Sequence, residues 1–173
     1  MNNRLRVLYA RLEDDRTRLM VELSSSSDDK LSLKPTKDKW SINEILTHLV
    51  TSEQLTIRYL RNKSLGVEQL RNSGLSEKTR YAILKISQRL PLKYKVPKHI
   101  LSHTPAALPF SQLQVIWSAT RLDLEGFLDS IAEENINKLI YKHPIAGRFD
   151  VAQCLMFMRE HYLHHLPQIK RLL

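Results

Sequence analysis

Four long stretches of this sequence repeat their apolar residues at helical spacing, and this pattern restricts the fold more than any other feature. The first ends at the polar run 24–30, the second covers 41–62, the third covers 111–133, and the fourth runs from Val151 to the C-terminus. Apolar residues three and four positions apart lie on one side of a helix. Only four glycines occur, and the abundant Leu, Lys, Glu and Ile favour helix over sheet. The sequence therefore predicts an all-α fold.

Between residues 63 and 109 the helical pattern weakens, and only a shorter helix is predicted, over 75–90. Prolines exclude one continuous helix after it; they are Pro91, Pro97, Pro105 and Pro109. The segment 135–148 is expected to be the last loop. Together these features predict one domain over 1–173, a four-helix bundle with a long crossover between its second and third helices.

The composition indicates a soluble, cytoplasmic protein. The N-terminus lacks the apolar run of a signal peptide, no segment is apolar for long enough to span a bilayer, and Cys154 is the single cysteine. The net charge of +9 is spread along the chain without a block of like charges, which favours a solvated basic surface. Neither nucleic acid nor membrane is expected as a partner. Arg58, Arg61 and the segment 93–98 could attract an anionic substrate, or could be ordinary surface charge.

The second and fourth helices begin at recognisable sequence signals. Ser41 followed three residues later by Glu44 is a capping box, and Trp40 before it can pack on Ile45 as a hydrophobic staple. Asp150 is expected to cap the last helix.

The last helix carries histidines where its buried stripe should be apolar. Its stripe residues, spaced three and four apart, are Val151, Cys154, Met158, His161, His165, Gln168 and Leu172. His161 and His165 lie one turn apart on one side, so both rings can reach one ion, as in helical zinc motifs. Apolar residues would pack better at these positions, and this indicates metal binding.

A third ligand has to come from another helix, and His48 is the best candidate. It lies in the apolar part of the second helix, next to Leu49. Three neutral imidazoles leave a coordination position open, as in catalytic zinc sites. The alternative is that these histidines are hydrogen-bonded core residues, and spacing alone does not decide between the two. His164 is expected to face solvent or a partner, and His143 to belong to a turn or to a wall of the site.

Three short motifs near the ends of the chain are distinctive. Residues 40–49 read WSINEILTHL, residues 143–147 read HPIAG, and residues 161–169 read HYLHHLPQI. In order and spacing they resemble the opening W-s-x-x-e-x-l-x-H-l, the HPxxG turn and the HxxxHxxQI close of the DinB-like superfamily, the family of DinB- and YfiT-type proteins. The resemblance covers essentially the whole chain, with the middle matched by helix pattern alone.

This resemblance implies a bundle that holds a divalent metal ion, zinc or nickel, on His48, His161 and His165. It also implies a metal-dependent hydrolase or a thiol transferase acting on a small molecule, and a homodimer. Two alternatives are a non-catalytic metal- or ligand-binding module connected with stress, and a basic bundle that binds nucleic acid.

The surroundings of the predicted ligands give fewer indications. Glu44 and Gln168, each one turn from a predicted ligand, are candidates for orienting a ligand or binding substrate. No side chain stands out as a general base, and Cys154 is interpreted as a small buried hydrophobic residue. Pro167 removes a hydrogen bond to the carbonyl of Leu163 and is expected to kink the last helix.

Overall fold

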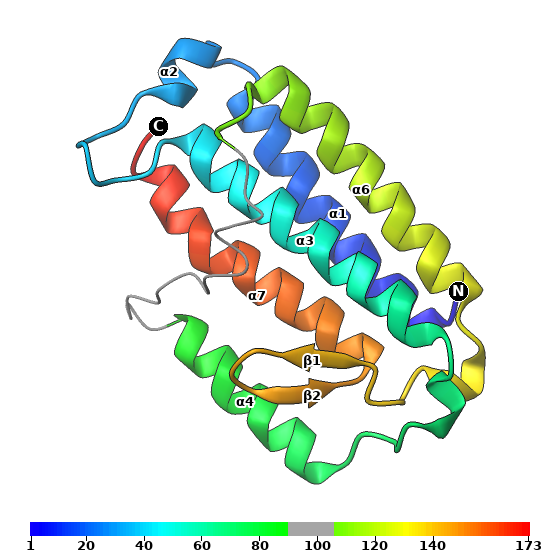
Figure 1. The fold of residues 1–173 in the computed structure, drawn as a ribbon. Helices are drawn as coiled ribbons and strands as arrows, with labels where there is room; N and C mark the ends of the chain where they lie inside the picture. The colour runs from blue at the N-terminus through cyan, green and yellow to red at the C-terminus, as the bar shows by residue number, and fades with distance from the viewer. Residues whose placement is uncertain (90–105) are drawn as a thin grey trace.

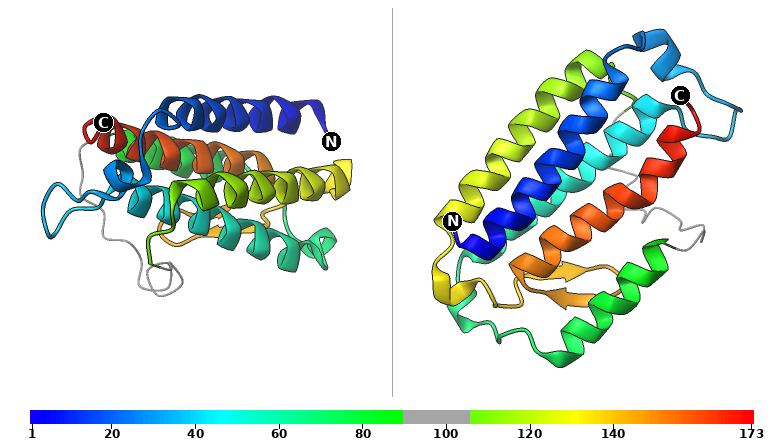
Figure 2. Two further views of the ribbon diagram at one scale, coloured as in Figure 1. Left: turned by 90° about the horizontal axis from the view of Figure 1, so that it is seen from above. Right: turned by 180° about the vertical axis from the view of Figure 1, so that it is seen from behind.

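The computed structural model describes residues 1–89 and 106–173, and this part of the chain is mostly helical (Figure 1). Its long helices lie side by side in all views (Figures 1 and 2). They are α1 (Asn3–Leu23), α3 (Ile42–Ser64), α6 (Phe110–Ser130) and α7 (Val151–Lys170). Both α1 and α3 pack against α6 and against α7. The four segments with helical spacing therefore form helices close to the predicted bounds.

Side chains fix the starts of the two helices that carry the predicted ligands. The Ser41 hydroxyl accepts the Glu44 amide at 3.2 Å, and Glu44 Oε2 accepts the Ser41 amide at 2.8 Å. At the start of α7, Asp150 Oδ1 accepts the Gln153 amide at 2.7 Å, and Gln153 Oε1 accepts the Asp150 amide at 3.1 Å. Such reciprocal bonds satisfy amides that have no partner within the helix. The capping box at Ser41 is confirmed, and the cap at Asp150 is a capping box as well.

Two small elements were not predicted from the sequence. A short helix α2 (Asp28–Ser32) begins within the polar run 24–30, and the last loop contains strands β1 (Tyr141–His143) and β2 (Gly147–Phe149). The strands form an antiparallel hairpin in which Lys142 lies opposite Arg148. Gly147 takes φ +85° in its turn, a conformation that favours glycine. Strands of three residues are too short to show a period, which is why the sequence pattern missed them.

The predicted shorter helix is present as α4 (Leu75–Arg89) and packs against α7 and β2. It lies at the edge of the molecule in Figure 1 and in the right-hand view of Figure 2. Two single-turn 3₁₀ helices, Val67–Gln69 and Glu133–Asn135, occur in the connections. Most of the proline-rich crossover, with His99 and His103, falls in 90–105, outside the described residues.

The apolar core has two parts that follow one another along the helices. On α3 the buried apolar residues of one part lie within 42–50 and those of the other within 57–60. On α6 the corresponding ranges are 110–117 and 124–128. Between the two parts of the core lie buried charged residues, Glu53 on α3 and Arg121 on α6. A buried polar layer therefore crosses the core at this level.

The polar layer is an ion pair with additional hydrogen bonds. Glu53 and Arg121 are 4% and 1% exposed, and Arg121 Nη2 donates to Glu53 Oε1 at 2.6 Å. The Trp117 indole donates to Glu53 Oε2 at 2.8 Å. Arg121 Nε lies 3.4 Å from Glu13 Oε1 on α1. These contacts connect α1, α3 and α6, and two of the three charged groups, Glu53 and Arg121, are buried.

Arg121→Leu is expected to destabilise the protein by about 3–5 kcal/mol, because it leaves the Glu53 carboxylate buried without a counter-ion. The double variant Glu53→Leu/Arg121→Leu should regain most of this loss, since no buried charge remains. Urea denaturation of the metal-free protein measures both. Arg61→Ala is the matched control: it breaks the Arg61–Asp123 pair, whose side chains are 44% and 52% exposed, and should change stability by less than about 1 kcal/mol. Equal destabilisation in the single and double variants would contradict this explanation.

Candidate metal centre

The three predicted ligand histidines come together between α3 and α7. One ring nitrogen from each of His48, His161 and His165 lies within 4.8 Å of the others, and the Nε2 atoms of His48 and His161 are 3.2 Å apart. The ring centroids form a nearly equilateral triangle with sides of 5.0–5.1 Å. Nitrogen ligands of a single zinc or nickel ion, each about 2.1 Å from it, stand at comparable separations.

The helices explain why the rings meet. His161 and His165 follow one another by one turn of α7, which aligns them on the same side. His48 lies in α3, less than two turns after the capping box at Ser41. Because both helix starts are fixed by side chains, the three rings project from rigid backbone.

Two aromatic side chains enclose the cluster. The Trp40 indole has its centroid 5.2 Å from that of His48 and 6.3 Å from that of His165, nearly parallel to the latter ring. On the other side, Phe157 stacks on His161 at 5.9 Å with an angle of 9° between the rings. This role of Trp40 was not predicted, since the sequence suggested only a contact with Ile45. The two aromatic walls limit the access of water to the rings.

Burial keeps the three imidazoles neutral. It lowers the pKa of His48 to about 4 and that of His165 to about 3, where the neighbouring charge of His48 adds to the effect. The pKa of His161 is also well below its usual value, through burial and then repulsion from His165 and His48. At neutral pH each ring therefore offers a lone pair, which is the form that binds a metal ion. His161 remains partly accessible, so the cluster has an open side.

Hydrogen bonds support one of the two predicted orienting residues. His165 Nδ1 lies 3.2 Å from Gln168 Oε1, so Nδ1 carries the proton and Nε2 is free as a ligand. The Glu44 oxygens are engaged elsewhere, with the Ser41 amide and with Lys34 Nζ at 2.9 Å. Nδ1 of His48 is buried and has no hydrogen-bond partner among the described residues. A ring that binds a metal ion through Nε2 carries its proton on Nδ1, so among the described residues His48 has no orienting partner comparable to Gln168.

His143 takes part in both the turn and the wall that the sequence suggested. Its Nδ1 accepts the amides of Ile145 and Ala146 at 3.1 and 2.9 Å, and so closes the hairpin turn. Burial lowers the pKa of His143 to about 4, so its remaining proton is on Nε2. The ring contacts Phe157 edge to face at 4.5 Å, and Phe157 in turn stacks on His161. His143 therefore supports the aromatic wall from behind.

Other polar residues of α7 have different partners. His164 Nδ1 lies 2.8 Å from the carbonyl oxygen of Gln88 on α4, so this residue contacts a neighbouring helix. Glu160 accepts two hydrogen bonds from Arg89 at 2.8 and 2.9 Å. Cys154 is fully buried, and burial raises the pKa of its thiol, in agreement with its interpretation as a small hydrophobic residue. The helix continues across Pro167 as far as Lys170.

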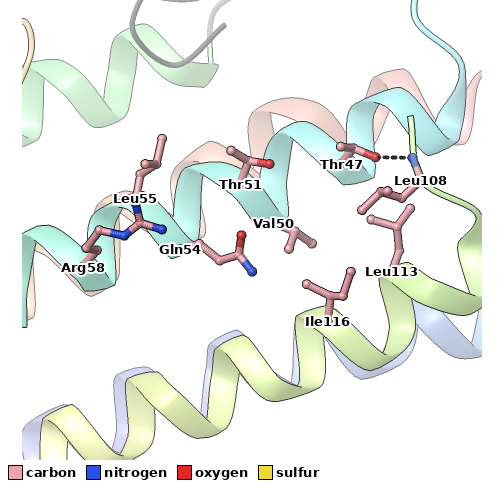
Figure 3. Close-up of a pocket in the computed structure, with 9 residues that line it drawn as sticks. All are labelled: Thr47, Val50, Thr51, Gln54, Leu55, Arg58, Leu108, Leu113 and Ile116. Atoms are coloured by element: carbon pink, nitrogen blue, oxygen red, sulfur yellow. Dashed lines mark hydrogen bonds between the residues drawn. The ribbon is translucent and has the colours of Figure 1, made fainter. Parts of the chain in front are cut away.

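A separate cavity of about 290 Å³ lies between α3 and α6 (Figure 3). Its walls combine polar α3 residues with apolar side chains, and the Thr47 hydroxyl accepts the Leu108 amide at 3.1 Å. The lining residues are Thr47, Val50, Thr51, Gln54, Leu55, Arg58, Leu108, Leu113 and Ile116. None of the three clustered histidines lines it, so it is not part of the candidate metal centre.

Comparison with known proteins places this chain in a family. The sequence profile described as "DinB superfamily" matches residues 11–169. The "Uncharacterized protein YuaE" of Bacillus subtilis (strain 168) is 28% identical over 151 residues, which cover 87% of this chain and 88% of that protein. A crystal structure described as a conserved protein of Enterococcus faecalis has a similar fold, with a TM-score of 0.60 at 15% identity over 96% of this chain and 93% of the other. The family profile thus spans both helices that carry the histidines, and the chain belongs to the DinB superfamily.

Proposed function

We propose that this protein binds one divalent metal ion through His48, His161 and His165, and that it is a metal-dependent enzyme acting on a small molecule. The observation that carries the proposal is the meeting of three neutral imidazoles, with one nitrogen of each within 4.8 Å of the others. The chemistry implied by the family is that of a hydrolase or a thiol transferase. We further propose that the long helices form the family's four-helix bundle, and that the protein works in the cytoplasm as a homodimer without a nucleic-acid partner.

The donor set suits zinc or nickel. Both ions accept imidazole nitrogen, and cells choose between them by availability as well as by affinity. Such an ion would act as a Lewis acid, which lowers the pKa of bound water or activates a thiol. Gln168 would hold the His165 ring with Nε2 free, and the walls of Trp40 and Phe157 would limit water around the ligands. Substrate would approach on the side where His161 is accessible.

One observation favours a second candidate, a module that binds metal or a small ligand without turnover. Among the described residues, no carboxylate is hydrogen-bonded to the three histidines, and Glu160 and Glu44 are engaged with other groups. A general base near the open side is therefore not evident. Screening the metal-loaded protein against thiol conjugates, esters and amides separates the two candidates, because only the enzyme gives turnover that His161→Ala removes.

The untagged protein is expected to bind one equivalent of zinc or nickel, and His161→Ala should abolish this binding, because two rings cannot hold the ion as three do. Metal analysis after dialysis and calorimetric titration measure it. His164→Ala is the control: it removes an imidazole that packs edge to face on His165 at 5.2 Å but does not belong to the ligand group, and it should bind metal as the unmodified protein does. Absence of stoichiometric metal in the unmodified protein, or equal binding by the His161 variant, would overturn the proposal.

Gln168→Ala is expected to weaken metal binding about 10- to 100-fold, since it removes the acceptor that orients the His165 ring. Gln168→Glu keeps an acceptor at the same distance along the side chain and should retain most of the affinity. Competition against a chelator of known affinity gives both values. If both variants bind as tightly as the unmodified protein, Gln168 has no orienting role.

The metal-free protein is expected to lose stability as the pH falls from about 6.5 towards 4. In the unfolded chain His48 takes up a proton near the ordinary histidine pKa of 6.5, whereas in the folded protein its pKa is about 4. The unfolded state thus binds more protons in this window, and the free energy of unfolding falls by up to about 1.4 kcal/mol per pH unit for such a histidine.

Urea denaturation at several pH values, with His48→Phe beside the unmodified protein, isolates this contribution. The variant should show a shallower pH dependence because one buried imidazole is gone. An identical slope in both proteins would show that His48 is not held neutral by burial.

A further inference from the structure

The outer side of α4 exposes an unusual number of large apolar side chains. Leu75, Ile83 and Ile86 are 80%, 63% and 63% exposed. Their helical spacing places them away from Leu84, the buried apolar residue of the helix. Ile145, in the neighbouring hairpin turn, is 75% exposed. We call these four residues the apolar stripe. Single exposed apolar residues are common, whereas a group of them on one element marks a contact surface.

Exposed cations occur on the same helix. Lys78 and Arg80 are exposed on α4. The Arg80 guanidinium lies against Gly147, and this contact joins the helix to the hairpin turn. The single acidic residue of α4, Glu77, is buried and bound to Arg71. On the neighbouring helix Glu160 is likewise buried and already paired, with Arg89 and more distantly Lys85. The described carboxylates therefore leave Lys78 and Arg80 without a counter-charge.

The hairpin adds two more cations in an unfavourable arrangement. Lys142 and Arg148 are directly opposite one another in the strand register, and both are exposed. Like charges at opposed positions destabilise a hairpin. An anion bound between them would remove that repulsion. Strand β2 and α4 are in contact, so the hairpin cations lie on an element next to the helix that carries most of the apolar stripe.

We propose that α4 and the hairpin turn form a surface that lies on anionic lipid membranes, with the apolar stripe entering the headgroup layer and the cations facing lipid phosphates. Helices of this composition bind in the plane of a membrane, and each Lys or Arg near an anionic leaflet adds to the attraction. No described helix is long and apolar enough to cross a bilayer. The expectation of no membrane partner rested on that absence, which does not bear on a peripheral contact.

Other partners fit the surface less well. A second copy of the chain would bring like charges together. Nucleic acid would use the cations but would gain nothing from exposed isoleucines, because its affinity comes from phosphate contacts. A stable protein interface needs about 800 Å² from each partner. A few protruding side chains on one helix do not form the closely packed apolar centre of such an interface. Binding to a lipid surface does not require a protein surface of complementary shape.

Sedimentation with vesicles tests the proposal. The metal-free or metal-loaded protein should bind vesicles of phosphatidylcholine mixed with phosphatidylglycerol, bind pure phosphatidylcholine at least about tenfold more weakly, and lose affinity as salt is raised. Ile83→Ser/Ile86→Ser should weaken binding to the mixed vesicles by at least about tenfold. Because both side chains are exposed, this variant should keep its thermal stability.

The matched control is Val115→Ser/Leu122→Ser on α6, where the two side chains are 70% and 67% exposed. It should bind mixed vesicles as the unmodified protein does. Equal binding to neutral vesicles, equal loss in both variants, or no vesicle binding would overturn the proposal. So would tight binding of duplex DNA that the isoleucine variant leaves unchanged. None of these outcomes depends on the histidine cluster, so the metal-binding proposal stands or falls separately.

Discussion

A buried carboxylate and a buried guanidinium hold three of the long helices at one level. Glu53 and Arg121 can remain charged in the core only while they contact each other, together with Trp117 and Glu13. A shift of α3 along α6 by one turn would separate the two charges in an apolar environment, at a cost of several kcal/mol. Apolar side chains on either side tolerate such a shift far better. The ion pair therefore selects one alignment among several that the apolar residues alone would permit.

The histidine cluster lies next to this polar layer, between α3 and α7. On α7 the apolar residues of the two core parts are separated at His161, as they are at Glu53 and Arg121 on the other helices. The cluster thus begins at the polar level of the core and extends towards one end of the helices. His48 and His161 face one another only if α3 and α7 keep their relative height. The ion pair aligns α3 with α6 and α1, and a further pair, Arg159 with Asp15 at 2.7 Å, joins α1 to α7.

The sequence predicted the helices and the histidine cluster because both appear as regular spacing of residues along the chain. Four long segments had three-and-four spacing, and histidines on two of them interrupted apolar stripes. The hairpin left no such trace, since Tyr141, Lys142 and His143 are too few to show alternation. The pairing of Glu53 with Arg121 joins residues 68 positions apart, and spacing within one helix carries no information about it. The same holds for Trp40, whose ring reaches His165 across the core. Apart from the three histidines, contacts between distant segments could not be predicted from spacing within single helices.

His48 and His161 are 113 residues apart along the chain, so a contact between them encloses a long loop. Any ligand that both rings share closes a loop containing most of the polypeptide. Closing a loop of this size restricts the unfolded chain much as a disulfide does, and the restriction grows only slowly with further length. A bound ion would then act as a removable crosslink between an early and a late helix. Chain entropy, as well as coordination chemistry, would make the supply of metal a determinant of how long the folded protein persists.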